Sequence, residues 1–355
     1  MAAVSPENAV TTHPLFIESI VEGITKVTGR SENIVIADSP AASIAYTKLN
    51  LRRLYEKTGL ADVAERTGCR LNFDTSHLNF SLDNGSSIKS FKIIKPAIDA
   101  DVIINLPKFK THSLTAISGA IKNLYGIIPG FTKISYHFSY NDVEKFSEML
   151  LSLVKFIKPA LNIMDAVLSL EGEGPGMSGI PRKTSLILAS DDAIAMDIIS
   201  TAIMNMKLEF NPVLEAAKRK FNTNLDADNI EVLGEKLSDV IISDFKYPEN
   251  IGKKGIIKNT FINTYIFPFL KNSFNPYPAS NDSKCNLCKT CIRICPQNAI
   301  YIKEGRISFN YKKCIRCFCC SEMCLESAIE IQYGMLANFI FKMLRKNELK
   351  SSLIH

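Results

Sequence analysis

The spacing of apolar residues alternates between two patterns over residues 1–242. Short and continuously apolar runs, such as residues 186–189, predict strands covered on both faces, as in a parallel sheet. Between these runs, apolar residues recur at helical spacing, for example over Val143–Ile157. The alternation predicts an α/β domain with a mostly parallel sheet. The predicted strands are 33–38, 88–94, 101–106, 161–170, 184–189 and 230–233, and the predicted helices are 15–27, 49–66 (divided at Gly59), 143–157, 193–206 and 213–221.

The periodicity weakens after residue 242. Over 243–280, Asn, Lys, Pro and aromatic residues follow one another without a clear period, and the prolines exclude a long helix. We therefore expect a connecting arm over 243–280. A small α+β domain rich in cysteine is expected over 281–333, and a separate last segment over 334–355.

The last segment, 334–355, has apolar residues at helical spacing, with Lys342, Arg345 and Lys346 elsewhere on the helix. This predicts an amphipathic helix with a basic face, which we expect to dock on the protein's own domains. Peripheral contact with a membrane surface is the alternative. No apolar run reaches the 20 or so residues that cross a bilayer. The first residues also lack the features of a secretory signal, and we expect a cytoplasmic protein.

The clustering of the cysteines changes what the composition implies about bound metal and net charge. Hydrophobic residues make up 46% of the chain and charged residues 22%, which excludes a disordered protein. Nine of the ten cysteines lie between Cys285 and Cys324. In a reducing cytoplasm such clustering indicates bound metal rather than disulfides. Because cluster-bound thiolates are negative, the formal charge of +6 falls to about +2, and a nucleic-acid partner is not expected.

The clustered cysteines contain two runs of identical spacing. The pattern Cys-x2-Cys-x2-Cys-x3-Cys occurs twice at an offset of 29 residues, which also relates Ala299 to Ala328 and Ile300 to Ile329. In such runs three cysteines bind one [4Fe–4S] cluster and the fourth binds the other. The segment resembles bacterial two-cluster ferredoxins. The predicted ligands are Cys285, Cys288, Cys291 and Cys324 for the first cluster, and Cys314, Cys317, Cys320 and Cys295 for the second.

Alternatives remain for the cysteines and their neighbours. Cys-x2-Cys pairs also bind zinc, but zinc does not explain a third cysteine at the same step in both runs. Cys319 lies outside the ligand spacing, and we interpret it as a small buried apolar residue rather than a spare ligand or redox thiol. Leu325 stands where the first run has Pro296. Nearby basic residues are either solvated, or offset the cluster charge and dock an acidic electron donor: Lys289, Arg293, Lys312, Lys313 and Arg316.

The α/β domain contains a cationic candidate site. Lys108, Lys110 and His112 follow a predicted strand and lie on one side of an extended segment. With Lys122 and Asn123 we expect them to form a pocket suited to a carboxylate, a phosphate or an oxyanion. A solvated loop is the alternative interpretation.

Two acids and a glycine-rich turn complete the candidates. Asp165 and Asp197 lie in apolar surroundings, where a carboxylate needs a cationic or hydrogen-bonding partner, and we expect Lys110 or Lys122 to supply it. A structural ion pair and a catalytic role both explain such acids. The turn over 171–176 precedes a predicted strand and matches neither a Rossmann fingerprint nor a P-loop. It is interpreted either as a substrate-facing loop or as a plain turn.

Several of these segments resemble, as a set, the motifs of the domain of unknown function 362 family. The resemblance spans residues 5–330, and members of that family often carry a C-terminal two-cluster ferredoxin domain. It implies no particular reaction, because the family has no assigned activity. Family members usually have a further N-terminal strand, and we expect this chain to be shortened or to begin upstream of Met1. The matching motifs are Thr11-Thr12-His13-Pro14, Asp38-Ser39-Pro40, 106–112, 121–126, 171–175 and Ala195-Met196-Asp197.

The sequence leaves three functions open. The first is an iron–sulfur oxidoreductase, in which two [4Fe–4S] clusters pass electrons to a small anionic substrate in the cationic pocket, with His112 or Lys110 as proton donor. The second is a ferredoxin-like electron carrier whose α/β domain recognises a redox partner protein. The third is a maturation or sensor protein with structural clusters. No pattern identifies the substrate, a flavin or a nucleotide. The oxygen sensitivity of exposed clusters favours an anaerobic cytoplasm.

Overall fold

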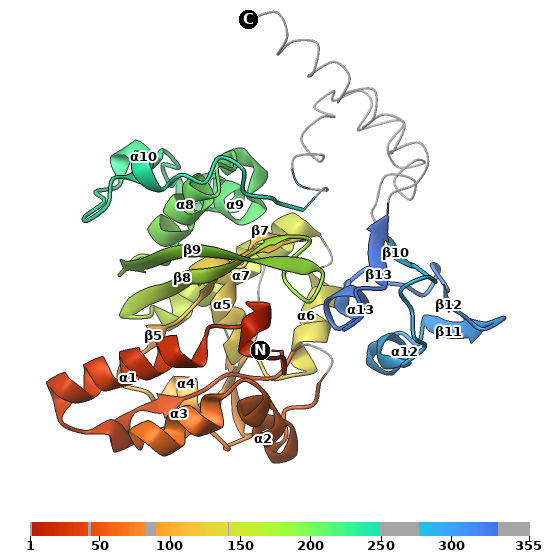
Figure 1. Ribbon diagram of the computed structural model, residues 1–355, viewed down its shortest axis with the longest axis horizontal. Helices are drawn as coiled ribbons and strands as arrows, with labels where there is room; N and C mark the ends of the chain where they lie inside the picture. Colours follow the sequence, from red (N-terminus) through yellow and green to blue (C-terminus); the bar gives the residue numbers. More distant parts are fainter. Residues whose placement is uncertain are drawn as a thin grey trace, which may run out of the picture. The chain divides into compact units, whose positions relative to one another are not determined.

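The computed structural model describes residues 2–41, 44–81, 90–140, 142–248, 251 and 277–332. The chain forms two compact units, Met1–Glu249 and Asn250–His355, which are described separately. Figure 1 shows the helices and strands of both. Most of the predicted connecting arm and the helix predicted over 334–355 lie outside the described residues.

The first unit is built on a sheet of five strands in the order β5-β8-β6-β7, with β9 paired to β8. β5, β8 and β6 run parallel, whereas β7 and β9 are antiparallel to their neighbours. The predicted α/β class is therefore confirmed. β9 is antiparallel because only a short turn separates it from β8, and a parallel neighbour needs a long crossover. The strands are β5 (Ile104–Asn105), β6 (Lys108–His112), β7 (Ala116–Ile117), β8 (Leu161–Gly172) and β9 (Gly179–Ser190).

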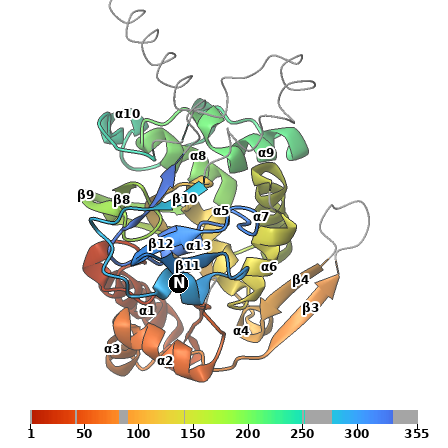
Figure 2. The same ribbon diagram turned by 90° about the vertical axis from the view of Figure 1, so that its right-hand side faces the viewer.

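Helices lie on both sides of this sheet. In the two views of Figures 1 and 2, α8 and α9 lie on one side of β8 and β9, and α1, α2 and α3 lie on the opposite side. Gly59 separates α2 from α3 with a φ of 76°, so the predicted division of that helix is confirmed. The helices are α1 (Pro14–Thr28), α2 (Lys48–Lys57), α3 (Leu60–Thr67), α4 (Lys95–Asp99), α5 (Gly119–Asn123), α6 (Thr132–Ser139), α7 (Val143–Ile157), α8 (Ala193–Ile203), α9 (Pro212–Phe221) and α10 (Leu237–Val240).

Four short strands of the first unit lie outside the main sheet. β1 pairs with β2 in parallel, and β3 pairs with β4 in an antiparallel hairpin. The strands predicted at 33–38 and 88–94 therefore form within these two small sheets. Their bounds are β1 (Val35–Ile36), β2 (Arg70–Leu71), β3 (His77–Ser81) and β4 (Ser90–Ile94).

The strand predicted over 230–233 is wrong. These residues follow a short 3-10 helix, Ala227–Asn229, and have no regular structure. The side chain of Leu233 is 85% exposed. Ile230 and Val232 favour extended backbone, but a strand forms only where a neighbouring edge accepts its backbone hydrogen bonds.

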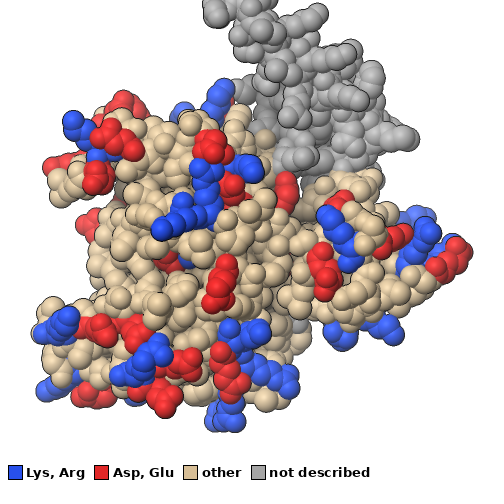
Figure 3. All heavy atoms as spheres, in the orientation of Figure 1, with Lys and Arg blue, Asp and Glu red and all other residues tan. Residues whose placement is uncertain are grey.

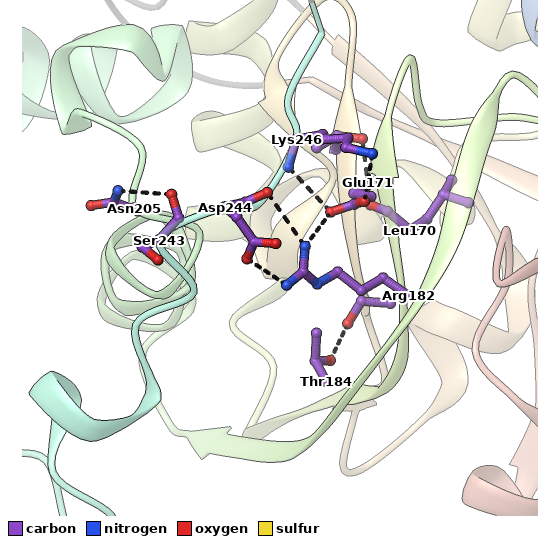
Figure 4. A network of polar contacts seen from close by, with 10 residues as sticks. Leu170, Glu171, Arg182, Thr184, Asn205, Ser243, Asp244 and Lys246 are labelled. Atoms are coloured by element: carbon purple, nitrogen blue, oxygen red, sulfur yellow. Dashed lines mark hydrogen bonds and ion pairs between the residues drawn. The ribbon is translucent and has the colours of Figure 1, made fainter.

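The β8–β9 hairpin holds the chain just after α10. Figure 4 shows the Arg182 guanidinium between two carboxylates. It donates to Glu171 at 3.0 Å and to Asp244 at 2.6 Å. The Lys246 N–H donates to Glu171 at 3.1 Å, and the Phe245 ring packs edge-on against Phe109 at 5.7 Å. The first residues of the predicted arm are thus fixed to the main sheet.

The second unit is small and rich in short strands. β10 and β13 form one antiparallel pair, and β11 and β12 form another. β10 begins at Tyr277, so it lies ahead of the domain boundary expected at residue 281. Buried cysteines and aliphatic residues, including Cys291, Ile300 and Ile329, form a common core. The elements are β10 (Tyr277–Ser280), α12 (Thr290–Ile294), β11 (Ile300–Lys303), β12 (Arg306–Phe309), α13 (Cys319–Glu322) and β13 (Ile329–Gln332).

The internal duplication extends to unusual backbone conformations. Three pairs of non-glycine residues, each related by the 29-residue offset, adopt left-handed backbone with φ between 46° and 62°. Both cysteine runs therefore fold along the same path, although the side chains at these positions differ. The pairs are Leu287 with Arg316, Lys289 with Phe318, and Asn298 with Ser327.

Charged side chains of both signs are interspersed over the face of the first unit shown in Figure 3. The formal charge of +6 therefore does not by itself mark a binding surface on this face. Within the described part of the chain, no helix combines the length and apolar character needed to span a membrane.

Candidate functional site

Four of the predicted cluster ligands line one cavity of the second unit. It is lined together by Cys295, Cys314, Cys317 and Cys320. Cys295 belongs to the first run and the other three belong to the second. The fold thus brings together the set predicted to hold the second cluster. Much of the remaining lining is apolar and includes Ile294, Ile300, Ile315 and Phe318.

The other four predicted ligands also lie near one another. Burial raises the pKa of the Cys291 thiol to about 11, and the neighbouring thiols of Cys324, Cys285 and Cys288 raise it further. They do so because nearby negative charge disfavours another thiolate. Cys324 therefore lies close to the first run, although it ends the second.

Equivalent hydrogen bonds hold the last cysteine of each run. The Ala299 N–H donates to Cys295 Sγ at 3.2 Å, and the Ala328 N–H donates to Cys324 Sγ at 3.2 Å. Such bonds orient the sulfur and favour the thiolate, which is the form that binds iron.

The donor set has the chemistry of iron–sulfur clusters. In the described part of the chain, no three His, Cys, Asp or Glu side chains converge as the ligands of a single metal ion would. A [4Fe–4S] cluster makes a different demand, since four cysteines bind four separate irons. Two groups of four cysteines in a largely apolar setting fit this demand. A bound cluster would supply one-electron redox chemistry there.

In the first unit, Lys108 and Asp165 form a buried ion pair. Their side chains are 2% and 1% exposed, and Lys108 Nζ lies 2.6 Å from Asp165 Oδ2. Asp165 also accepts the backbone N–H of His13 at 2.9 Å and that of Val167 at 3.1 Å. The expectation that Lys110 or Lys122 pairs with Asp165 is therefore wrong. The partner is Lys108, because β6 runs parallel to β8 with Lys108 beside Asp165.

Lys110 and His112, further along β6, face different partners. Lys110 Nζ donates to the carbonyl of Val10 at 2.6 Å and contacts that of Pro175 at 3.4 Å, which ties the N-terminal segment to the glycine-rich turn. His112 is 2% exposed, and its Nδ1 accepts the N–H of Leu114 at 3.0 Å. The proton of the neutral ring is therefore on Nε2.

Two ammonium groups act on this buried imidazole. Burial is the first cause that lowers the pKa of His112 well below its usual value, and Lys122 and Lys110 lower it further. The Lys122 ammonium lies over the ring of Tyr125, 5.1 Å from its centroid. His112 is therefore a neutral hydrogen-bond donor at neutral pH rather than a source of an acidic proton.

Asp197 holds the helix that carries Lys122. Its two carboxylate oxygens accept the backbone N–H groups of Ala120 at 2.5 Å and Ile121 at 3.2 Å, at the start of α5. A Cβ on Gly119 would overlap the carboxylate, and the φ of Gly119 is +51°, so only glycine fits there. Asp197 was expected to pair with Lys110 or Lys122, but the groups that it binds here are backbone N–H groups. Asp197 positions Lys122 rather than contacting it.

This geometry predicts a pH dependence of stability. Burial raises the pKa of Asp197 from its usual 3.8 to about 7, so between these values the folded protein binds a proton that the unfolded chain releases. Stability should therefore fall as the pH rises from 4 to 7. Over this pH range we expect the free energy of unfolding of wild type to fall by roughly 2–4 kcal/mol relative to that of Asp197→Asn, because asparagine imitates the protonated acid. Urea unfolding of both proteins across this range measures the difference, and a constant difference would contradict the prediction.

Two titratable residues of α6 were not predicted as site residues: Lys133, which is buried, and His137, which is half-buried. Lys133 Nζ donates to the carbonyls of Ser39 at 3.2 Å and Pro40 at 2.9 Å, and to the Ser39 hydroxyl. Burial lowers the pKa of Lys133 to about 8. Burial likewise lowers the pKa of His137 to about 3, and Lys122 and Lys133 lower it further. Lys133 and His137 are four residues apart, which places them on one face of a helix. No helix was predicted over these residues, so this signal was not used.

The fold and the cysteine sites define an iron–sulfur protein with an α/β domain. Comparison with protein families supports this class, because a 4Fe-4S dicluster domain matches residues 277–325. The chain belongs to the family described as domain of unknown function (DUF362), whose match over residues 1–202 covers more than half of it. The resemblance stated from the motifs is thereby confirmed.

One curated relative is the thylakoid-associated protein sll1697 of Synechocystis sp. strain PCC 6803. It is 32% identical over 200 residues, which are 55% of this chain and 61% of the relative. The chain therefore spans less than two thirds of that protein's length. No solved structure matches the chain.

Proposed function

We propose that this protein transfers electrons through two [4Fe–4S] clusters. Cys285, Cys288, Cys291 and Cys324 would hold the first, and Cys314, Cys317, Cys320 and Cys295 the second. The observation that carries this proposal is the cavity lined by Cys295 together with three cysteines of the other run. Crossed ligation of this kind is typical of two-cluster ferredoxins.

We further propose that the first unit binds a small anion and that the protein reduces it. The charges of Lys110 and Lys122 both act on the buried ring of His112, and such a group of cations favours an anionic ligand. The hydroxyl of Thr11 is buried, and the described residues give it no hydrogen-bond partner. It follows Val10, whose carbonyl accepts from Lys110. A bound anion would supply the missing partner.

The electron count suits such a reaction. Each cluster carries one electron, so two reduced clusters supply the pair that a two-electron reduction needs. A redox partner protein would supply these electrons, and solvent would supply the protons that His112 does not release. Lys108 and Asp165 support the site through their ion pair and are not expected to contact the substrate.

One experiment tests both parts of the proposal. Anaerobically purified protein should contain about eight irons and eight sulfides per chain. After reduction with dithionite and removal of the excess, reoxidation of the clusters is followed by their visible absorbance with pyruvate, oxaloacetate or 2-oxoglutarate, anions whose reduction to the 2-hydroxy acid takes two electrons and two protons. We expect one of these anions to accelerate reoxidation, and Lys122→Gln to slow that step at least tenfold because the anion loses a counter-charge.

Lys155→Gln is the matched control, because Lys155 also lies over an aromatic ring, that of Phe221, at 5.5 Å. It should leave reoxidation unchanged. Clusters that reoxidise at the same rate with every anion would contradict substrate reduction and favour a simple electron carrier. Zinc in place of iron would contradict both parts.

A further inference from the structure

The turn that leads into each cysteine run is the same in both halves of the second unit. It begins at Asn281 before the first run and at Asn310 before the second, at the offset of 29 residues. The side-chain oxygen of each Asn accepts the N–H two residues later, from Ser283 at 3.2 Å and from Lys312 at 3.1 Å. An asparagine that bonds its own backbone in this way fixes the turn. The side chains that follow are therefore presented alike in the two halves.

The three side chains after this asparagine differ in chemistry. The first half has Asp, Ser and Lys at 282–284, and the second half has Tyr, Lys and Lys at 311–313. Both charges of the first half are paired, at 3.2 Å with Glu330 and at 3.4 Å with Arg306. The two lysines of the second half are exposed, and no carboxylate in the described part of the chain forms an ion pair with them. The duplication thus leaves an uncompensated positive charge in the second half only.

An aromatic cluster surrounds Tyr311 beside these lysines. Its ring stacks on Phe309, with 5.9 Å between centroids and 11° between planes, and meets Tyr277 edge-on at 5.2 Å. The rings come together because β10, which begins at Tyr277, lies beside β12, which ends at Phe309 (Figure 1). Tyr311 is 44% exposed. We refer to Tyr277, Phe309, Tyr311, Lys312 and Lys313 as the Tyr311 surface.

The Tyr311 surface borders the site of the second cluster. The hydroxyl of Tyr311 donates to the carbonyl of Pro278 at 3.1 Å, and Pro278 lines the cavity that the four cysteines of that site share. Lys313 directly precedes Cys314, the first of these cysteines within the second run. A protein seated on this surface would therefore lie close to the second cluster. Electron transfer between proteins requires such closeness, because its rate falls steeply with distance.

The composition of the surface indicates what kind of partner fits it. Aromatic side chains are typical of the centre of a protein interface, and charged side chains are typical of its rim. Exposed lysines attract an acidic protein and steer its approach, and brief redox encounters need only a small contact area. An anionic membrane fits less well, because two lysines hold a chain weakly there and closeness to a redox centre has no use in that role.

We propose that the Tyr311 surface is where an acidic electron-carrier protein docks and reduces the second cluster. This inference rests on the two-cluster electron transfer proposed above and names the donor and its point of entry. The donor's redox centre is oxidised by one electron and the cluster is reduced by that electron. No covalent bond forms or breaks in this step, and no proton is transferred.

The test is stopped-flow reduction of the full anaerobic chain by an acidic flavodoxin in its hydroquinone form. When the anionic hydroquinone gives one electron to a cluster it becomes the neutral semiquinone, whose absorbance reports the transfer. In wild type the second-order rate constant should fall at least about tenfold between about 20 mM and about 500 mM salt, because salt screens the steering. Lys312→Glu combined with Lys313→Glu should lower the low-salt rate constant at least about tenfold.

The dependence on salt separates docking from a change in the cluster itself. At high salt the rate constants of wild type and of this double variant should converge, whereas a changed cluster potential would persist. Lys303→Glu combined with Arg306→Glu is the matched control, because it reverses two neighbouring exposed cations at the tip of the β11–β12 hairpin. It makes the same change in net charge and should lower the low-salt rate constant by less than about threefold.

Tyr311→Asn tests the aromatic part of the surface. Asn is the neutral counterpart of Asp282, which occupies the same place in the first half, so the turn accommodates it. The variant should lower the rate constant about threefold or more at high salt as well as at low salt, because salt does not screen the contact of a ring. An unchanged rate constant would mean that Tyr311 takes no part in docking.

The remaining outcomes separate the inference from the function on which it rests. Reduction that is independent of salt, or that slows as much in the control as in the lysine variant, would overturn the inference and leave two-cluster electron transfer intact. Self-association that the lysine variant abolishes would assign the surface to a second copy of this chain. Binding to vesicles of phosphatidylserine and phosphatidylcholine that the same variant abolishes would assign it to a membrane. A preparation without two clusters at full iron supply would overturn both the inference and the proposed function.

Discussion

Replacing Asp165 with alanine is expected to lower the free energy of unfolding of the first unit by about 3–5 kcal/mol. Lys108 would then hold an unpaired charge or give up its proton at a site where its side chain is 2% exposed, without the carboxylate that lies 2.6 Å away. The N–H groups of His13 and Val167 would also lose an acceptor. The loss is large because water cannot reach the buried ammonium to replace these interactions.

Urea unfolding followed by far-ultraviolet circular dichroism measures this loss. Glu18→Ala is the control, because it breaks the ion pair with Arg66, whose side chain is 50% exposed, and should change stability by less than about 1 kcal/mol. The double variant Lys108→Met with Asp165→Leu should recover most of the loss, since it removes both charges. A change of under 1 kcal/mol in Asp165→Ala would show that Lys108 finds another partner.

Replacing Cys295 with alanine is expected to remove one entire cluster and about half of the iron. Cys295 faces the same cavity as Cys314, Cys317 and Cys320, so its loss leaves that group with three thiolates. Cys319→Ala is the matched control within the same cavity, and it should retain the full iron content. Iron and sulfide analysis of anaerobic protein gives the result directly.

A pair of double variants distinguishes crossed from sequential ligation. Under crossed ligation, Cys295→Ala combined with Cys314→Ala loses no more iron than either change alone, because both residues hold the same cluster. Cys295→Ala combined with Cys291→Ala should lose nearly all the iron. The reverse pattern would mean that each run holds its own cluster.

The sequence predicted the long elements and the cysteine domain because their signals are local. α7 matches its predicted bounds at Val143–Ile157, and the spacing of eight cysteines alone pointed to the domain that the family comparison identifies. The strand predicted over 230–233 failed because strand formation depends on a partner edge, which a local pattern does not contain.

The polar residues of the first unit were harder to assign, since their roles depend on contacts between distant segments. Asp165 pairs with Lys108 and not with Lys110, because register between β6 and β8 decides which lysine lies beside it. Asp197 binds backbone N–H groups of α5, a partner that carries no side-chain signal. Lys133 reaches Ser39 and Pro40 from about 90 residues away along the chain.

The paired left-handed residues of the second unit link its folding to the supply of iron. Each of these six non-glycine residues holds a conformation that is disfavoured by about 1 kcal/mol or more. A unit of this size has a small core with which to offset that energy, and metal ligation is the larger source of stability in such domains. We expect assembly of the clusters and folding of the unit to be one coupled equilibrium. Iron availability would then set not only the redox activity of the chain but the fraction of molecules in which its second unit is folded at all.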